Sequence, residues 1–574
     1  MSNTSPLQSF LAGKAFIIPK YQRDYAWTKE EVGELFGDVQ EALDAGTSHY
    51  LGTVVLVQTT TAYEVVDGQQ RLSTLMLFVH SLLMQLDNTD PVRIADQIYL
   101  LKKGDVLKLD FGVNQSFVID MLAGRELKPS TGGQRRLKEV YQYCCERAHA
   151  IAATNRNNIY SWLETIKNLE IIQFIEENSG RAIRIFQSIN DRGRQLTDMD
   201  KAKALLVLYS NRFLHEELDT QINDAFGACF AAFDRVREQA HQDGYKIDTI
   251  DRKDFSENDF LRYHYLAYDA QEANDFYGYS DIILNQFLKP ALRDRKDDHV
   301  QLRAFISNYV QDLENFARAF ASLIDATRSD ARLFTLLVVH GLAARLYPLM
   351  IRLFERNLLY HPIPDQDQFD ILSAITCVDL RVYKIRGTDL AKDIGNLSHA
   401  SRTAAVSDIA ARLRAFVINF MPDGLMQTHL GGRIYKSGAV VPILLAFEQN
   451  GTQAYSVQRL VELVQRGPTQ EHILAQEPSF DYTVRGFENQ TEFEEYIDRI
   501  GNLSLLTAAE NSRCSHYSAE IKMSRPELYL SSNFAGPRRL AQEFNVSGAA
   551  FDKTAVITRT KELTEFALAN WSIW

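Results

Sequence analysis

The chain has 574 residues, a formal net charge of -12 and a hydrophobic fraction of 45%. This length predicts several domains or one large body with lobes, and the apolar fraction excludes a disordered or collagen-like protein. The acidic balance argues against a protein that coats nucleic acid through bulk charge, although it allows a local basic groove. The five cysteines are scattered without a CxxC pair, which argues against a disulfide scaffold or cysteine-based zinc site and predicts a reducing, cytoplasmic setting.

The chain begins with mixed strand and helix patterns. The segment FIIPKY (16–21) is short, apolar and contains a proline, which predicts an edge strand. Residues 28–43 carry apolar side chains at helical spacing. Thr28 followed by Glu31 predicts a capping box at the start of that helix.

A strand pair and a helix are expected next. The β-branched runs 51–58 and 62–66 predict a hairpin. The dipeptide Asp67-Gly68 then predicts a turn into an apolar helix.

Helical patterns dominate the centre of the chain. Residues 134–169 are predicted to be helical, 171–177 to form a strand, and 196–466 to form an all-α region. Thr197 is a candidate N-cap of the helix that opens this region. The most apolar stretch, 334–351, is interrupted by charged residues and a proline, so it predicts a buried helix pair and not a membrane span.

The turn VVDGQQR has the residues of a phosphate-binding site. A helix N-terminus attracts phosphate through unpaired N–H groups and its dipole. Gly68 permits close backbone approach, Arg71 adds a guanidinium fork, and Gln69 and Gln70 add neutral donors and acceptors. Asp67 is suited to cap the helix or to hold a magnesium ion. The alternative is an Asp-Gly turn that caps a core helix beside an incidental arginine.

Two basic segments flank this turn in the sequence. IPKYQRDYAW (18–27) interleaves basic and aromatic residues, a pattern that grips nucleotides or single strands, or that simply anchors a loop. SGRAIRIFQSINDRGRQLTDMDKAKALL (179–206) is rich in basic residues, a pattern that taken alone is typical of a solvated face.

Together, the motifs IPKYQRDYAW, DGQQRLSTL and FQSINDRGRQLTDMDKAKALL resemble the N-terminal domain of the GmrSD family of Type IV restriction enzymes. Such domains are similar to the ParB/sulfiredoxin fold, in which the equivalent turn handles a nucleotide. The resemblance implies nucleotide binding and hydrolysis. The residues it points to are Gln22, Arg23, Asp67, Gly68, Gln69, Gln70, Arg71 and Asn190.

A second constellation lies near the C-terminus. EHILAQ (471–476) is followed about thirty residues later by IGNLSLLTAAENSRCSH (500–516). Metal-assisted phosphodiester cleavage needs oxygen ligands for a hard cation and a general base near the attacking water. Glu471 and Asn511 offer oxygen ligands and His472 a base, although neighbouring residues on a strand point to opposite sides. The alternative is a hairpin with a surface Glu-His pair.

The combined C-terminal string resembles the HNH (ββα-metal) domain of the same family. That resemblance implies a metal site at Glu471 and Asn511, a base at His472, a bracing role for Asn502 and a phosphate contact for Lys522. Ala475 stands where the family usually has proline, so the loop is expected to be less rigid than in the family pattern. TRTKELTEFALANW (558–571) also resembles the closing helix of the family.

The sequence thus predicts an α+β, predominantly helical protein. Its expected parts are a ParB/sulfiredoxin-like domain (1–205), an all-α middle region (206–466) and an HNH (ββα-metal) nuclease domain (467–574). Residues 461–510 carry ten acidic and three basic side chains, whereas 511–539 carry five basic and two acidic ones. The nuclease candidate therefore lies where acidic ligands for a cation meet a basic strip for phosphate.

The leading expectation is a nucleotide-dependent DNA endonuclease that restricts modified phage DNA in the cytoplasm. Its cofactors would be Mg²⁺ (or Mn²⁺) and an NTP, and its partners double-stranded DNA and a second copy in a homodimer, since double-strand cleavage with one metal site per chain favours two active sites. Two alternatives stay open: a nucleotide-gated sensor of modified DNA with weak or nicking-only nuclease activity, and a nuclease that acts on RNA.

Overall fold

A computed structural model describes residues 2–19, 22–177, 197–242, 244–268, 282–364, 366, 369–390, 392–450, 454–477 and 481–574. The protein is α+β and mostly helical, as predicted from the sequence. Its contacts divide the chain into two compact units. Unit 1 comprises Met1–Glu238, Ser256–Leu261 and Ser280–Arg318, and unit 2 comprises Gln239–Phe255, Arg262–Tyr279 and Ala319–Trp574. The predicted domain boundaries at 205 and 466 stay predictions.

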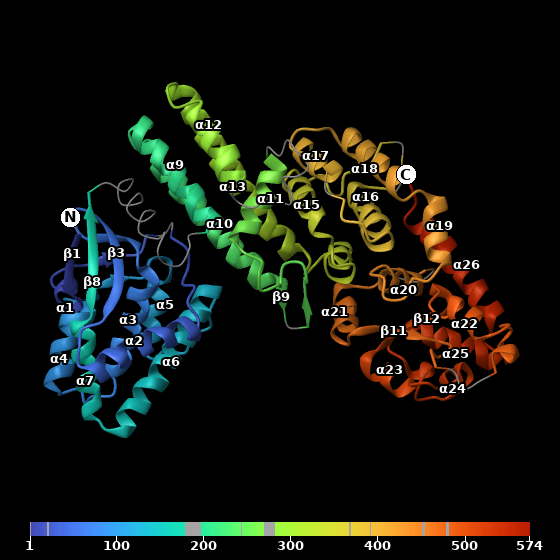
Figure 1. Ribbon diagram of the computed structural model, residues 1–574, viewed down its shortest axis with the longest axis horizontal. Coiled ribbons are helices and arrows are strands. Elements are labelled where there is room, and N and C mark those ends of the chain that lie inside the picture. The colour runs from blue at the N-terminus through green and yellow to red at the C-terminus, as the bar shows by residue number, and fades with distance from the viewer. Residues whose placement is uncertain are drawn as a thin grey trace. The chain divides into compact units, whose positions relative to one another are not determined.

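Unit 1 is built on a six-stranded mixed sheet in the order β1-β8-β3-β4-β2-β7 (Figure 1). The strands are β1 (Ser2–Pro6), β2 (Phe16–Ile17), β3 (Tyr50–Gln58), β4 (Tyr63–Asp67), β7 (Leu109–Asp110) and β8 (Glu170–Glu176). β3 and β4 form the predicted antiparallel hairpin, and β8 confirms the strand predicted at 171–177.

The prediction of an edge strand at 16–21 was wrong. β2 lies inside the sheet, because Phe16 and Ile17 pair in parallel with β4 on one side and with β7 on the other. Pro19 follows the end of the strand and removes no ladder hydrogen bond there. A two-residue strand followed by proline is thus compatible with an interior position.

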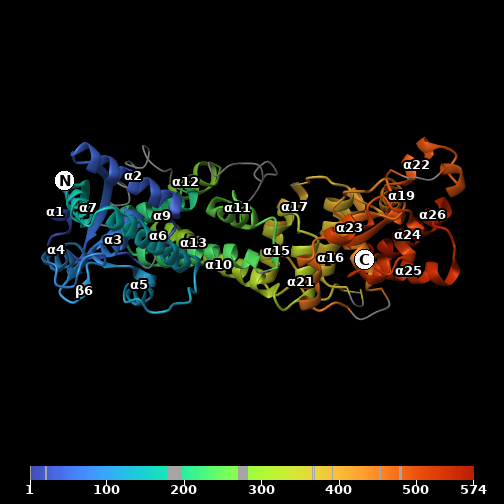
Figure 2. The same ribbon diagram turned by 90° about the horizontal axis from the view of Figure 1, so that it is seen from below.

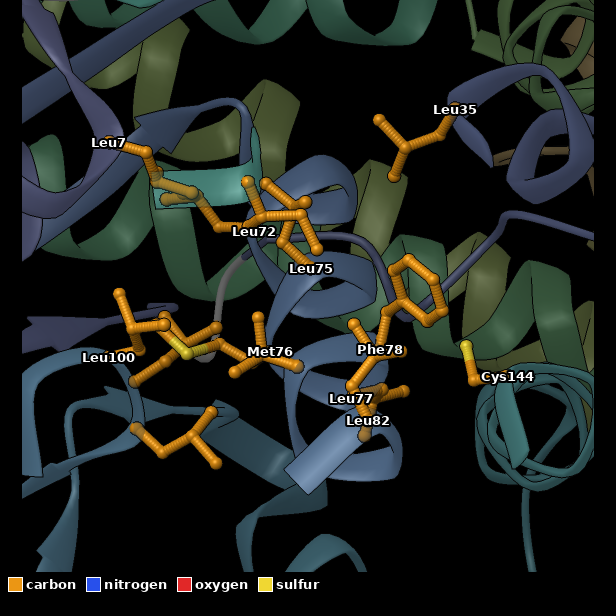
Figure 3. Packing of buried hydrophobic residues seen from close by; sticks show 14 of the residues in the cluster. Leu7, Leu35, Leu72, Leu75, Met76, Leu77, Phe78, Leu82, Leu100 and Cys144 are labelled. Atoms are coloured by element: carbon orange, nitrogen blue, oxygen red, sulfur yellow. The ribbon is translucent and has the colours of Figure 1, made fainter. Parts of the chain in front are cut away.

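Helix α3 (Gln69–Leu83) is the centre of unit 1. Nearly all of its side chains are buried, including polar ones, as expected for a helix packed on all sides. It contacts α6 (Gly132–Thr154) and α7 (Asn157–Asn168), which confirm the predicted helices between 134 and 169. Figure 3 shows α3 side chains among this core, with Phe78 on the side of Cys144 from α6. The phosphate-binding candidate is therefore the first turn of a rigidly held helix.

Helix α2 (Lys29–Ala45) packs against α6 and α7 beside this core. It begins with the predicted capping box of Thr28 and Glu31. Phe36 of α2 packs against Phe78 of α3 with tilted rings, whose centroids are 4.2 Å apart. Further α-helices among the described residues up to Ala326 are α1 (Leu7–Leu11), α4 (Pro91–Asp96), α5 (Gln115–Leu122), α9 (Asp198–Leu214), α10 (Asp219–Ala240), α11 (Glu257–Tyr268), α12 (Lys289–Arg293) and α13 (His299–Ala326). Of these, α10, α11 and α13 continue into unit 2. Thr197 caps α9 through the N–H of Asp200, as predicted.

The long final segment of unit 2, from Ala319 onward, begins as helices and ends in a smaller mixed region. Its α-helices are α14 (Ala331–Phe334), α15 (Tyr347–Glu355), α16 (Ile371–Val378), α17 (Lys392–Ala400), α18 (Val406–Phe420), α19 (Asp423–Gly431), α20 (Val440–Glu448), α21 (Val457–Gln465), α22 (Gln490–Tyr496), α23 (Ala508–Cys514), α24 (Ala519–Ser524), α25 (Ala535–Ser547) and α26 (Lys553–Asn570). α24 packs against α25, and Figure 2 shows both among the orange and red elements of the last part of the chain. A short hairpin of β9 (His241–Gln242) and β10 (Tyr245–Lys246) interrupts the region predicted to be all-α.

The apolar stretch 334–351 is folded into several short pieces, with a π-helix (Thr335–Val339) and a 3-10 helix (Ala344–Leu346) between α14 and α15. Among the described helices, none is both long and apolar enough to cross a membrane.

Candidate functional site

The first candidate site is the turn between β4 and α3. Gly68 has a φ of +91°, and a methyl group there would lie 2.8 Å from Val54 Cγ2, so this position requires glycine. Gly68 provides no capping side chain for α3, so the helix dipole at Gln69 is uncompensated by a side-chain cap. An uncapped helix start of this kind is suited to bind an anion.

A β-bulge precedes this turn. Val55 pairs with Asp67 while Leu56 pairs with Val65, so Val66 is the extra residue. The amide of Gln22 donates to the Val66 carbonyl oxygen at 3.3 Å. The bulge therefore gives the IPKYQRDYAW segment a backbone contact with the DGQQR turn.

Gln70 holds the loop before α2 in place. Its Oε1 accepts the N–H of Ala26 at 2.8 Å, and its Nε2 donates to the Asp24 carbonyl oxygen at 3.3 Å. Gln69 Nε2 donates to the Arg23 carbonyl oxygen at 3.4 Å, whereas Gln69 Oε1 is buried with no hydrogen-bond partner among the described residues. The two glutamines thus differ. Both the oxygen and the nitrogen of the Gln70 side-chain amide are hydrogen-bonded to the loop, whereas the Gln69 side chain donates one hydrogen bond to the loop and its oxygen is left without a donor among the described residues.

Asp24 ties the same loop to the start of α6. Its carboxylate accepts hydrogen bonds from Asn114 Nδ2 at 2.5 Å and from Thr131 Oγ1 at 3.0 Å. A methyl group at Gly133 would lie 1.9 Å from Asp24 Oδ1, so the carboxylate rests directly on the helix start. Asp24 therefore holds the loop before α2 against the start of α6, a structural role that the IPKYQRDYAW motif alone did not reveal.

Arg71 lies across β3. Its Nη1 donates to the Thr53 carbonyl oxygen at 3.1 Å. A methyl group at Gly52, where φ is +122°, would lie 2.6 Å from Arg71 Nη1. Gly52 therefore makes room for the guanidinium.

Asp67 is a carboxylate in a shielded position at the end of β4. Burial raises the pKa of Asp67, while the Gly68 N–H and the nearby Arg71 and Arg23 oppose that rise. The charge of Asp200, at the start of α9, adds to it. The positive charges of Arg71 and Arg23 are therefore close enough to Asp67 to stabilise its ionised carboxylate.

The predicted nucleotide residues are partly brought together. Gln22, Arg23, Gln69 and Gln70 line one small cavity. Asp67, Gly68 and Arg71 lie on the adjoining turn. Asn190 lies outside the described residues.

The second candidate site is a hairpin followed by a helix. β11 (Pro468–His472) and β12 (Leu503–Thr507) pair antiparallel, with Glu471 opposite Ser504. α23 follows at once and begins with a capping box of Thr507 and Glu510. The predicted hairpin and the predicted helix that carries Asn511 are confirmed.

Asn502 braces the loop of this hairpin and is fully buried. Its Oδ1 accepts the N–H of Leu474 at 2.8 Å, and its Nδ2 donates to the carbonyl oxygens of Leu474 and Ile497. This is the bracing contact that the sequence pattern implied.

Glu471 forms a buried ion pair with Lys522 of α24. The Lys522 Nζ lies 2.7 Å from Glu471 Oε1 and also donates to the His472 carbonyl oxygen at 2.7 Å. Burial raises the pKa of Glu471, and the Lys522 ammonium counteracts this rise. Lys522 therefore neutralises a carboxylate that is expensive to bury alone.

Asn511 lies on the same face of the hairpin as Glu471. Its Nδ2 donates to Thr469 Oγ1 at 3.0 Å, and Thr469 precedes Glu471 by two residues on β11. Two oxygen-bearing side chains, one from the strand and one from the helix, thus share a face.

His472 points to the opposite side of β11. Its Nε2 lies 3.1 Å from Asp498 Oδ1, and its ring meets that of Tyr435 edge-on, with centroids 4.3 Å apart. Burial lowers the pKa of His472, while Asp498 counteracts this effect. The imidazole is therefore neutral near pH 7 and able to accept a proton.

Among the described residues, no group of three or more His, Cys, Asp and Glu side chains is arranged to hold a metal ion. Glu471 and Asn511 together provide one carboxylate and one amide, the hard oxygen donors that Mg²⁺ uses when it keeps several waters. The donor chemistry therefore fits a magnesium ion held by few protein ligands.

Family models match both ends of the chain. The GmrSD restriction endonuclease N-terminal domain matches residues 7–207, which contain the first candidate site. The GmrSD restriction endonuclease C-terminal domain matches residues 440–566, which contain the second. No curated protein matches the chain.

These two matches, in this order, span more than half of the chain and define a nuclease that acts on DNA. The chain belongs to the GmrSD family of Type IV restriction endonucleases.

Sequence patterns did not reveal several residues of these sites. Gly52 has no motif around it, and Arg433 and Tyr435 are distant from the hairpin in sequence. Asp498 lies four residues before Asn502, and only the fold shows that it faces His472.

Proposed function

We propose that the chain is a nucleotide-dependent and metal-dependent endonuclease that restricts modified foreign DNA. Phosphodiester hydrolysis would take place at the hairpin site, and NTP hydrolysis at the DGQQR turn. The observation that carries the nuclease proposal is the pairing of a buried Glu471 with a buried, Asp498-bound His472 on consecutive residues.

Glu471 and Asn511 would hold the metal ion. When bound, a divalent ion of this kind withdraws charge from the scissile phosphate and its leaving oxygen. Lys522 already occupies one side of Glu471, at 2.7 Å, so the ammonium holds the carboxylate oriented and charged. The predicted phosphate contact of Lys522 would be secondary to this role, since only 1% of its surface is exposed.

His472, the last residue of β11, would act as the general base, with the scissile phosphate lying at the end of the strand, where side chains from both of its faces are within reach. The neutral state of His472, favoured by burial, leaves one ring nitrogen able to take a proton from an attacking water. The ionised Asp498 would stabilise the imidazolium that results. Its pKa is lowered although burial alone raises it, because hydrogen bonds from Arg433 and His472 outweigh the burial.

The N-terminal turn would bind the phosphates of an NTP. Its support is the uncapped start of α3, the glycine at Gly68 and the guanidinium of Arg71 beside them. Gln69, whose buried Oε1 has no hydrogen-bond partner among the described residues, lines the small adjoining cavity with Gln22 and Arg23, where the water that attacks the nucleotide would be oriented.

Cleavage of phage DNA with defined modifications, with and without Mg²⁺ and each NTP, tests this proposal. Modified DNA cut only when metal and nucleotide are both present supports it. Cutting that is independent of both additions contradicts it.

One observation favours a second function, a nucleotide-gated sensor of modified DNA whose nuclease is weak or only nicks. The ammonium of Lys522 competes with a metal ion for Glu471. Single-strand nicks that persist at saturating Mg²⁺ and NTP, without linear product, favour this second function. Linear product favours a homodimer that cuts both strands.

A further inference from the structure

We propose that Asp498 and Arg433 are positioning residues for His472. Asp498 fixes the imidazole with its proton on Nε2, so that Nδ1 is the nitrogen that takes a proton from water, and Arg433 fixes Asp498. This inference rests on the proposed role of His472 as the general base.

Each oxygen of the Asp498 carboxylate has its own partner. Oδ1 lies 3.1 Å from His472 Nε2. Oδ2 accepts from Arg433 Nη2 at 2.6 Å and from Arg433 Nε at 3.1 Å. Because the guanidinium only donates, it keeps Oδ2 on its side and leaves Oδ1 for the imidazole.

The environment confines His472 to this orientation. His472 is 7% exposed and Asp498 is 8% exposed. The Tyr435 ring covers the imidazole edge-on. A buried ring between a carboxylate and an aromatic side chain has little freedom to flip.

The segment that carries Arg433 and Tyr435 is itself fastened to the hairpin. The N–H groups of Ile434 and Tyr435 donate to the Asp498 carbonyl oxygen at 2.9 and 3.2 Å. Gln470 Oε1 accepts the N–H of Lys436 at 2.8 Å. Backbone and side chain of Asp498 thus bind the same segment, which lies against β11.

This arrangement fixes the tautomer of His472. A carboxylate can only accept, so Nε2 must carry the proton that bonds to Oδ1. Nδ1 then has the free lone pair. During cleavage the proton of the attacking water would pass to Nδ1, and the positive charge on the ring would face the ionised Asp498.

Two of these residues lie outside the matched C-terminal domain. The C-terminal family model begins at residue 440, whereas Arg433 and Tyr435 precede it. The segment after α19 therefore contributes to the orientation of the catalytic base.

Substitution of Asp498 by asparagine in the full-length protein tests the tautomer directly. Arg433 has only donors, so the asparagine would turn its oxygen towards Arg433 and its NH₂ towards His472 Nε2. His472 would then carry its proton on Nδ1 and lose its basic nitrogen. We expect kcat for cleavage to fall by about 10–100-fold, with KM for DNA unchanged.

The Asp498→Asn, Arg433→Ala double variant gives the decisive contrast. Without the guanidinium, the asparagine is free to turn its oxygen towards Nε2–H and to restore the productive tautomer. We expect the double variant to cleave at least several-fold faster than Asp498→Asn. A purely structural role for Asp498 predicts the reverse, because two contacts of this carboxylate are then lost instead of one.

Two further variants make the outcomes separable. Glu495→Gln, an exposed carboxylate-to-amide change on the same segment, is expected to cleave like the wild type. A cleavage-competent His472→Ala variant would refute the base assignment and thus the proposed nuclease site. An inactive His472→Ala variant together with a fully active Asp498→Asn variant, or a double variant no faster than Asp498→Asn, would overturn the positioning role alone.

Discussion

The ammonium of Lys522 lies 2.7 Å from the carboxylate of Glu471, and both side chains are almost completely buried. Breaking one partner of such a pair leaves an uncompensated buried charge and costs about 3–5 kcal/mol. The same carboxylate is the proposed ligand of the metal ion. A substitution that removes the Lys522 ammonium is therefore expected to change both the stability of the fold and the proposed binding of a metal ion at Glu471.

Lys522→Met is expected to lower the thermal unfolding midpoint, and added Mg²⁺ is expected to recover more of that loss than it adds to the wild type. The reason is that a bound cation replaces the missing ammonium beside Glu471. Differential scanning fluorimetry with and without Mg²⁺ checks this. Lys561→Met, which removes an exposed pair with Glu565, serves as the control. Equal Mg²⁺ responses in Lys522→Met and wild type would argue against metal binding at Glu471.

The two glutamines of the DGQQR turn are expected to behave differently. Gln70→Ala leaves the Ala26 N–H and the Asp24 carbonyl oxygen without their partner, and should lower stability by about 1–3 kcal/mol. Gln69→Ala removes an unpartnered acceptor and should reduce NTP turnover with a smaller loss of stability. Denaturant unfolding and phosphate-release assays compare them. Equal stability losses in the two variants would refute this division.

Gly52→Ala should reproduce the effect of Arg71→Ala on NTP turnover. A methyl group at position 52 would lie 2.6 Å from Arg71 Nη1 and so displace the guanidinium. Gly37→Ala, on an exposed helix position with nothing close to its added methyl group, is the matched control. Normal turnover in Gly52→Ala or in Arg71→Ala would remove Arg71 from the nucleotide site.

Stability should decline as the pH falls from about 6.5 to about 4. Burial lowers the pKa of His80 from its usual 6.5 to about 4, and Tyr141 Oη lies 2.9 Å from its Nδ1. The unfolded chain therefore binds a proton in this window that the folded chain does not, and the stability present above pH 6.5 is lost through it, by at most about 3 kcal/mol.

His80→Gln should flatten this pH dependence, and His516→Gln, at an exposed histidine, should leave it unchanged. Thermal unfolding midpoints between pH 4 and pH 8 provide the comparison. If all three proteins lose stability equally between pH 6.5 and pH 4, His80 is not the responsible group.

Local signals predicted much of the fold. Thr28 and Glu31 predicted the start of α2, and Asp67-Gly68 predicted the turn into α3. The helix predicted to carry Asn511 likewise follows the hairpin directly, as α23. Such features depend on neighbours within a few residues, so sequence spacing reveals them.

The missed features depend on distant partners. β2 lies inside the sheet because β7, some ninety residues later, pairs with Phe16 and Ile17. Arg433 reaches Asp498 across 65 positions of sequence. The sequence around Arg433 and the sequence around Asp498 contain no pattern that predicts this ion pair, because the two residues come together only when the chain folds.

The most direct test of the nuclease site is plasmid cleavage by His472→Ala in the presence of Mg²⁺ and NTP, with phosphate release measured in the same reaction. We predict that cleavage falls by at least about 100-fold, while NTP hydrolysis persists because the DGQQR turn is intact. Wild-type cleavage by His472→Ala would contradict the account.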